Sequence, residues 1–352
     1  MAINFCSDNV SGVSPEIMAA ITAANDGAAM PYGQDEVSAR LTAQFAEVFE
    51  TDLAVFPVVT GSAANGLALA SLAPPYGAIY CHADSHINSD ECGAPEFFTA
   101  GGKLVPLDGE DCKIDPAALT RALDRSGAGM VHYVQPAVLS LTQATESGTL
   151  YRADEIRSLS DTAHERGLSV HMDGARFANA LAATNASPAE MSWRAGVDVL
   201  CLGATKNGAM AAEAVIFFNP DRARETGFRR KRGGHLLSKM RFLSAQLEAY
   251  LADGLWLRNA GRANARAREL ADGLAALPGA RRLYPVEANE MFFELPAPVR
   301  AAFEAAGVLF YPWPRLGPGV IRLLTSFETT ESEIQAALEI ARRALEGRER
   351  VQ

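Results

Sequence analysis

The chain has 352 residues, 48% of them hydrophobic and 21% charged, with a formal net charge of −10 at pH 7. A chain of this size and composition can bury a large core and is expected to form two domains. The acidic balance disfavours binding to nucleic acid or to an anionic membrane surface, since both need a basic surface.

Predicted helices and strands alternate from residue 36 to about residue 245. Helices are expected at 36–50, 62–73, 115–125 and 152–167, and Asp115 with Pro116 gives the third a capped start. Strands are expected at 54–59, 78–82, 103–107, 130–135, 168–173, 197–203 and 214–218. This alternation predicts an α/β fold whose mostly parallel central sheet is covered by helices on both faces.

The C-terminal part has a different pattern. A largely helical region at 233–275 precedes short strands at 291–295, 309–313 and 320–325. A last helix follows a capping box formed by Thr330 and Glu333. We therefore expect an N-terminal arm (1–15), a large domain (16–248) and a smaller C-terminal α+β domain (249–352).

Cysteine usage and the N-terminal segment bear on the compartment. The five cysteines form no CxxC pair, which favours a reduced, cytoplasmic setting. Residues 1–10 lack the basic start and apolar core of a signal peptide. The uncharged span 53–81 is interrupted by glycine and proline, so no membrane-spanning helix is expected there.

Polar side chains follow several of the predicted strands. In an open α/β sheet, ligands bind at the carboxyl ends of the strands. The segments after the predicted strands contain one potential anion-binding helix start and several charged or titratable groups, namely Ser62, His86, Asp173, Arg176 and Lys206. These residues are expected to lie at one edge of the sheet.

Lys206 is an unusual lysine, because it lies between two apolar runs and no acidic residue occurs within six positions of it. A desolvated lysine has a lowered pKa and is a nucleophile toward carbonyl groups. A surface lysine in a turn between strands explains the same pattern, and Lys206 alone does not distinguish the two interpretations.

The other candidates also have two interpretations each. Asp173 could hold a pyridine nitrogen protonated, or it could pair with Arg176 or cap the next segment. His86 could stack on a heteroaromatic ring or occupy a turn. The small residues Gly61, Ser62 and Ala63 open a helix and could bind a phosphate, although such starts also occur without a ligand. Together these groups suit pyridoxal 5′-phosphate (PLP), and no metal site is expected.

Seven motifs make the sequence resemble the L-threonine aldolases of the aspartate-aminotransferase-like PLP superfamily, in particular the low-specificity branch that includes phenylserine aldolases. They are FCSDNVSG (5–12), PYGQDEVSARL (31–41), TGSAANGLAL (60–69), SHINSDECGAPE (85–96), HMDGARFANA (171–180), GATKNGAMAAEAVIFF (203–218) and RLLTSFETT (322–330). The resemblance covers nearly the whole chain, and it implies the PLP-dependent fold type I.

The resemblance also implies a role for each matching residue. Lys206 would form a Schiff base with PLP, Asp173 would pair with the pyridine nitrogen, and His86 would stack on the ring. Gly61, Ser62 and Ala63 would hold the phosphate. Arg176 and Arg322 would bind the substrate carboxylate with help from Ser7. Glu91 would lie near the substrate hydroxyl. Tyr32 and the basic loop at Lys231 would reach the site from a partner subunit of a homodimer or homotetramer.

One departure from the family pattern concerns the base for the substrate hydroxyl. Many family members carry a second active-site histidine in an Asn-Thr-His-like stretch after the strand expected here at 130–135. This chain has QPAVLSLTQ there, with Gln135, Pro136 and Ala137. The base could be His86, Glu91 or a bound water.

The implied reaction is the reversible retro-aldol cleavage of a β-hydroxy-α-amino acid, such as threonine, allo-threonine or phenylserine, to glycine and an aldehyde. A PLP-dependent β-eliminating lyase, deaminase or aminotransferase of the same fold is the alternative. A ligand-sensing module of a transcriptional regulator is disfavoured, because the catalytic-type motifs begin at residue 5 and leave no room for a DNA-binding unit.

Overall fold

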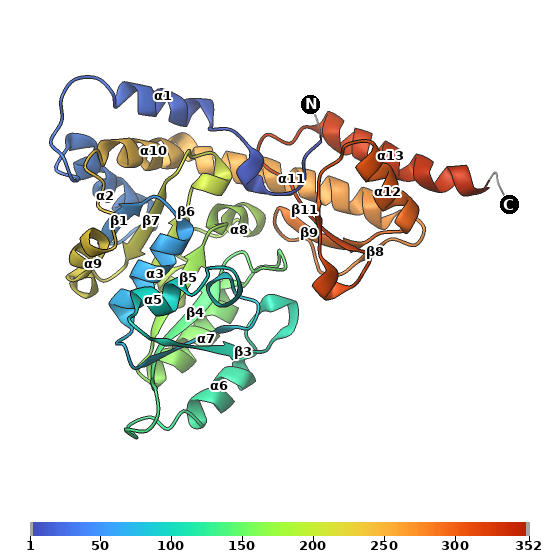
Figure 1. The fold of residues 1–352 in the computed structure, drawn as a ribbon. Coiled ribbons are helices and arrows are strands. Elements are labelled where there is room, and N and C mark those ends of the chain that lie inside the picture. The colour runs from blue at the N-terminus through green and yellow to red at the C-terminus, as the bar shows by residue number, and fades with distance from the viewer. Residues whose placement is uncertain (1–2, 350–352) are drawn as a thin grey trace.

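The computed structural model describes residues 3–349 and arranges them around two sheets (Figure 1). The larger sheet has seven strands in the spatial order β1 (Ala54–Val58), β7 (Glu213–Phe217), β6 (Val199–Gly203), β5 (Ser169–Gly174), β4 (Gln135–Thr142), β2 (Gly77–His82) and β3 (Lys103–Leu107). Strand β7 runs antiparallel to β1 and β6, and all other neighbours pair in parallel. The predicted mostly parallel sheet is confirmed.

Helices cover both faces of this sheet, which explains why β6 and β7 are buried at every position. Leu200 and Leu202 of β6 face one core, which is shared with α2 (Glu36–Phe49), α6 (Pro116–Asp124), α7 (Ala153–Glu165) and α10 (Arg241–Leu251). Val199 and Cys201, on the opposite face, pack against α3 (Gly61–Leu72). The remaining helices of this part are α1 (Pro15–Ala23), α4 (His86–Ser89), α5 (Ala94–Phe98), α8 (Phe177–Thr184) and α9 (Thr226–Arg232).

The strand predicted at 130–135 is wrong, because the strand in that region is β4 at Gln135–Thr142. Met130 and Val131 are exposed, and the turn that holds them is closed by a hydrogen bond from Gly129 N to Gln135 Oε1. Pro136 suggested a loop, yet it lies at the start of β4 beside an irregularity in the pairing with β2. A strand tolerates proline at such a position.

This shift of the strand moves the expected loop. Ala137 lies within β4 and packs against a core on one face of the sheet, so it does not follow the strand. His132, predicted to lie on a strand, is exposed in the preceding segment. The segment that follows β4 therefore begins at Gln143 and includes Glu146.

Helix α3 begins at Gly61, the first of the three residues predicted to hold a phosphate. Thr60 is its N-cap, and the Thr60 hydroxyl accepts a hydrogen bond from Ala63 N at 3.2 Å. The helix is buried along most of its length, which fits its lack of charged residues. Gly66 permits close packing against α5, since a Cβ there would come within 2.7 Å of the Phe98 ring.

The smaller sheet is antiparallel, with the strand order β10 (Tyr311–Pro312), β11 (Val320–Leu324), β9 (Glu290–Glu294) and β8 (Arg281–Arg282). It packs against α11 (Leu255–Ala275), α12 (Ala297–Ala305) and α13 (Glu331–Glu349). The predicted capping box is confirmed, because Thr330 N donates to Glu333 Oε2 at 2.8 Å and Glu333 N donates to Thr330 Oγ1 at 3.3 Å.

Two segments connect the parts of the molecule. Helix α11 contacts α8 beside the large sheet and α13 beside the small one. The N-terminal segment pairs with the small-sheet part, where Phe5 N donates to Leu309 O, and then forms the 3-10 helix η1 (Asp8–Val10). The division at residues 15 and 248 stays a prediction. No helix within residues 3–349 has the length and apolar character needed to span a membrane.

Candidate active site

The carboxyl ends of the parallel strands bring the main sequence-predicted residues together. Asp173 lies near the end of β5, His86 follows β2 at the start of α4, and Lys206 lies in the 3-10 helix η4 (Thr205–Asn207) after β6. These residues line a cavity of about 290 Å³, here called the inner pocket. Other residues of the inner pocket include Gly61, Ser62, Glu91, Glu146, Arg176 and Glu213.

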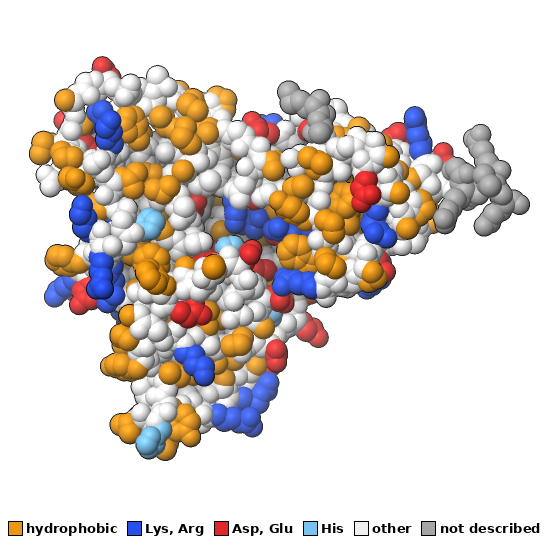
Figure 2. All heavy atoms as spheres, in the orientation of Figure 1, with side chains coloured by type: hydrophobic (Ala, Val, Ile, Leu, Met, Phe, Trp, Pro, Cys, Tyr) orange, Lys and Arg blue, Asp and Glu red, His pale blue; other side chains and the backbone are white. Residues whose placement is uncertain are grey.

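A second cavity, of about 510 Å³, opens beside the first and is called the outer pocket. Its walls come from the N-terminal segment, the large sheet and the small sheet, and include Ser7, Asp84, Glu290, Trp313, Arg315 and Arg322. Figure 2 shows basic side chains gathered in the hollow between the parts that carry the two sheets. Five residues line both pockets: Asn9, His86, Glu146, Arg176 and Lys206.

A buried chain of hydrogen bonds connects His86 to Asp173. His86 Nδ1 lies 2.8 Å from Glu91 Oε1, and Asn65 Nδ2 donates to both Glu91 Oε1 and Asp173 Oδ2 at 2.8 Å. The hydrogen bond with Glu91 raises the pKa of His86. Asp173 also accepts from Ala175 N at 3.0 Å. The chain fixes His86 and Asp173 relative to each other in the inner pocket.

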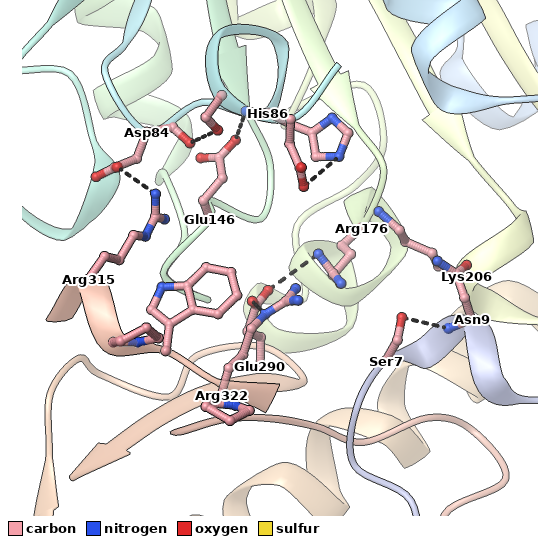
Figure 3. Close-up of a pocket in the computed structure, with 15 residues that line it drawn as sticks. Ser7, Asn9, Asp84, His86, Glu146, Arg176, Lys206, Glu290, Arg315 and Arg322 are labelled. Carbon is pink, nitrogen blue, oxygen red and sulfur yellow. Dashed lines mark hydrogen bonds and ion pairs between the residues drawn. The ribbon is translucent and has the colours of Figure 1, made fainter. Parts of the chain in front are cut away.

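The two predicted carboxylate-binding arginines lie on either side of Glu290 (Figure 3). Arg176 Nη1 is 3.3 Å from Glu290 Oε2, and Arg322 Nε donates to Glu290 Oε1. On its other edge Arg176 donates from Nε and Nη2 to the two oxygens of Asp8, at 2.7 and 3.1 Å. Arg176 therefore pairs with Asp8 and Glu290, and it forms no ion pair with Asp173 within residues 3–349.

Burial and charge act against each other in this cluster. Burial by itself would raise the pKa of Asp8, but the neighbouring Arg176 and Lys206 hold it below its usual value. Burial would lower the pKa of Arg176, but Asp8 and Glu290 keep it raised. The cluster is thus held by mutual neutralisation of buried charges, which makes each member costly to remove alone.

The start of α3 has free hydrogen-bond donors. No carbonyl or side chain in the described part of the chain accepts from the N–H groups of Gly61 or Ser62, and both residues line the inner pocket. Ala63 differs from them, since its N–H donates to Thr60 and it lines neither pocket. Thr60 and Thr205 also line the inner pocket and add hydroxyl groups near this end.

Tyr32 and Lys231 lie apart from the other predicted residues. They contact each other, with Lys231 Nζ 5.0 Å from the centre of the Tyr32 ring, and neither lines the inner or the outer pocket. Tyr32 is 45% exposed. Ser7, in contrast, lines the outer pocket, where its hydroxyl accepts from Asn9 N at 3.1 Å.

Sequence reasoning missed four acidic or amide residues of the site. Asp8 and Asn65 lie inside quoted motifs, where a polar residue next to small or apolar neighbours was the available signal. Glu146 was missed because the strand was predicted at 130–135. Had the strand been predicted at 135–142, Glu146 would have followed the end of a strand. Glu290 is the first residue of β9 in the small sheet, and nothing in the sequence connects it with Arg176.

Comparison with known proteins assigns the family. The family model described as Beta-eliminating lyase matches residues 4–297. A low specificity L-threonine aldolase from Pseudomonas aeruginosa is 47% identical over 339 residues, which cover 96% of each chain. The chain belongs to the low-specificity L-threonine aldolase family.

Solved structures agree with this family assignment. A threonine aldolase from Leishmania major superposes with a TM-score of 0.90 at 29% identity, covering 97% of this chain and 99% of that one. A serine palmitoyltransferase from S. paucimobilis with bound PLP has a TM-score of 0.71 at 17% identity, covering 97% of this chain and 87% of that one, and shows the fold alone. The fold of this threonine aldolase family member is therefore that of the fold type I PLP-dependent enzymes.

Proposed function

We propose that the protein is a PLP-dependent aldolase that cleaves L-threonine, L-allo-threonine or a related β-hydroxy-α-amino acid, such as phenylserine, to glycine and an aldehyde. The observation that carries this proposal is the convergence of Lys206, Asp173 and His86 on one pocket in a chain of the threonine aldolase family. The pair Arg176 and Arg322 in the adjoining cavity supplies a site for an amino-acid carboxylate.

The inner pocket has the donors and acceptors that PLP requires. At one end, the free N–H groups of Gly61 and Ser62 suit a phosphate. Deeper in the pocket, the Asp173 carboxylate suits a protonated pyridine nitrogen, and Asn65 and Ala175 hold it in place. Buried oxygens of Asn65 and Glu91 lack a hydrogen-bond partner within residues 3–349, as expected of a site built around a polar ligand.

The bound cofactor would supply an electron sink that accepts the pair of electrons of the broken Cα–Cβ bond. The protein residues would do the rest. Lys206 would hold the cofactor covalently through its amine, and His86 would cover the ring face. Arg176 and Arg322 would bind the substrate carboxylate and so set which bond at Cα lies perpendicular to the ring. For an aldolase that bond must be Cα–Cβ.

The arginine pair is already aligned for this task. Asp8 engages Nε and Nη2 of Arg176, and Glu290 lies between the two guanidinium groups. Prior alignment lowers the conformational entropy that substrate binding would otherwise cost. Ser7 lies in the same pocket and can add a hydroxyl donor to the carboxylate.

Product analysis tests the proposal directly. The purified protein, loaded with PLP, is incubated separately with threonine, allo-threonine and phenylserine. Glycine with acetaldehyde or benzaldehyde is the expected result. Ammonia with a 2-oxo acid would identify a β-eliminating lyase instead, a candidate that the name of the matching family model keeps open. Transfer of the amino group to an added oxo acid would identify an aminotransferase.

We also propose that the enzyme acts in the cytoplasm as a homodimer or homotetramer with shared active sites. The exposed Tyr32 and Lys231 support sharing, because a partner could insert them into a site that they do not reach in their own chain. Sedimentation measures the assembly, and a Lys231→Ala variant that assembles normally but keeps full PLP affinity would contradict the shared site.

A further inference from the structure

Glu146 lies where the two pockets meet. It is one of the five residues that line both, and Figure 3 shows it across the cavity from Arg176, Arg322 and Lys206. A substrate whose carboxylate is bound by the arginines and whose amine is near Lys206 would have its remaining Cα substituent inside this junction. The group on that substituent which must lose a proton is the β-hydroxyl.

The turn that carries Glu146 is held firmly. The hydroxyls of Thr145, Ser147 and Thr149 donate to the carbonyl oxygen of Asp111 at 3.2, 2.7 and 2.7 Å. Gly148 N donates to Thr145 O at 2.9 Å and closes the turn. A carboxylate on such a turn keeps its position while a ligand binds, which is a requirement for a proton acceptor.

The Glu146 carboxylate is available as an acceptor. Its Oε1 accepts from the backbone N–H of His86 at 2.8 Å, while Oε2 is buried and accepts no hydrogen bond within residues 3–349. No Lys, Arg or His of the described chain forms an ion pair with it. Burial raises the pKa of Glu146 to about 7, and the nearby negative charge of Asp173 adds to the increase.

The groups that face Glu146 come from every neighbouring element. They are His86 of α4 through its backbone, Thr142 of β4, Asp173 of β5, Cys81 of β2, Cys112 and Tyr151. Burial raises the pKa values of Cys112 and Tyr151 to a range in which both stay neutral at pH 7, and the pKa of Cys81 to about 11. Asp173 is therefore the facing acidic group whose charge raises the pKa of Glu146, and the cationic Arg176, Arg322 and Lys206 lie across the cavity.

We propose that Glu146 is the base that takes the β-hydroxyl proton during cleavage, an inference that rests on the proposed aldolase function. The substrate O–H bond breaks and its proton passes to a Glu146 oxygen. The electron pair left on the substrate oxygen becomes the second bond of the aldehyde carbonyl, and the Cα–Cβ pair would be accepted by the electron sink that the bound cofactor supplies. Glu146 later releases its proton to solvent, while Cα of the product glycine takes one up, so that atoms and charge balance.

The two residues named earlier as possible bases suit the task less well. His86 uses Nδ1 for the hydrogen bond with Glu91, and that bond raises the pKa of His86 and favours the protonated ring, which has no proton-accepting nitrogen. Glu91 has a fully buried side chain, contacts His86 and Asn65, and does not line the outer pocket. Glu146 differs from both, because it lines both pockets and pairs with no cationic side chain within residues 3–349.

Glu146→Gln is the test variant, because glutamine keeps the size of the side chain and an acceptor for His86 N–H but cannot take the proton. We expect kcat for phenylserine cleavage to fall by roughly 10²–10⁴-fold, the usual contribution of a general base. Glycine has no β-hydroxyl, so exchange of its α-hydrogen with D₂O should stay near the wild-type rate. The PLP dissociation constant of the apoprotein should also stay unchanged.

The pH profile gives a second readout. The ionised carboxylate is the active form, so wild-type kcat/KM should fall as the pH drops through about 7, the pKa of Glu146. The residual activity of Glu146→Gln should lack this decline. Glu287→Gln is the matched control, because Glu287 binds Arg152 and the N–H of Leu150 in the same segment but lines neither pocket; it should keep the wild-type profile.

Several outcomes would overturn the inference. Cleavage by Glu146→Gln within threefold of wild type would do so, as would an equal loss of cleavage and glycine exchange. If Glu146→Gln fails to fold, Glu146→Asp replaces it: a reduced kcat with the acid decline retained supports the base, and wild-type kcat contradicts it. A wild-type protein that yields no glycine and aldehyde refutes the proposed function instead.

Discussion

The inner and outer pockets are built in different ways. The inner pocket is formed almost entirely at the carboxyl edge of the large sheet, where Asp173 lies near the end of β5, and His86 and Lys206 follow the parallel strands β2 and β6. The outer pocket needs the N-terminal segment and the small sheet to pack against that edge, since Ser7, Glu290 and Arg322 belong to them. Under the proposed function, cofactor binding would therefore depend on local topology, and substrate recognition would depend on how distant segments pack.

Asp173→Asn should have the largest effect among the substitutions that compare the inner pocket with the outer one. Asparagine cannot stabilise a protonated pyridine nitrogen by charge, so we expect kcat to fall by roughly 10²–10³-fold, as when one electrostatic stabiliser is removed from an active site. Steady-state kinetics at saturating PLP measures this loss.

Asp198→Asn provides the comparison for Asp173→Asn. Asp198 directly precedes β6 and so lies at the amino ends of the parallel strands, away from the inner pocket. There it accepts a hydrogen bond from Val170 N and pairs with His164 and Arg222. Its loss should affect stability but leave kcat near wild type. Equal kcat values for the two variants would contradict the role given to Asp173.

Arg322→Gln should act on the outer pocket and leave cofactor binding intact. Removing a charge-assisted hydrogen bond to the substrate carboxylate costs about 1.5–3 kcal/mol, which corresponds to a rise in KM of roughly 10- to 150-fold. The PLP affinity, measured by titrating the apoprotein, should change little.

Arg281→Gln is the control for Arg322→Gln. Arg281 forms an exposed ion pair with Glu294 on the same small sheet and lines neither pocket. Exposed pairs contribute little, so its KM should match that of wild type. If Arg322→Gln lost as much affinity for PLP as for the substrate, the proposed separation of cofactor binding in the inner pocket from substrate binding in the outer pocket would be wrong.

Gly148→Ala tests the contact between the turn that carries Glu146 and strand β9 of the small sheet. Gly148 has a φ of +80°, and a Cβ there would lie 2.5 Å from the carbonyl oxygen of Glu290. Gly167 has a similar φ of +78° with no atom within 4 Å of a built Cβ. Gly167→Ala should therefore cost only the backbone strain of about 1–2 kcal/mol.

The comparison of the two glycine variants isolates the clash. Gly148→Ala should cost about 1–3 kcal/mol more than Gly167→Ala, because overpacking is added to the strain. Urea unfolding of the two variants measures the difference. We also expect a loss of activity in Gly148→Ala alone, since Glu146 and Glu290 lie on the two sides of the contact. Equal unfolding free energies would show that β9 moves aside without cost.

The contrast between the inner and outer pockets also explains which site residues the sequence could predict. Strand order and the rule that ligands bind at strand ends place Lys206, Asp173, His86 and Ser62 at one edge without any knowledge of packing. Arg176 and Asp8 are 168 positions apart, and their pairing follows only from how the N-terminal segment packs. Glu146 was missed for a local reason, because exposed Met130 and Val131 resembled a strand and Pro136 resembled its end.

Reduction with borohydride followed by peptide mapping tests the proposed chemistry most directly. If Lys206 holds PLP through its amine, reduction of the loaded protein should fix the cofactor on the peptide that contains Lys206, and on no other lysine. Lys206→Ala should lose the label together with the visible absorbance and lower turnover by roughly 10³-fold or more, as for a residue that acts as part of a catalytic unit. A label on Lys231 or another lysine, or an unlabelled protein at saturating PLP, would contradict the proposal.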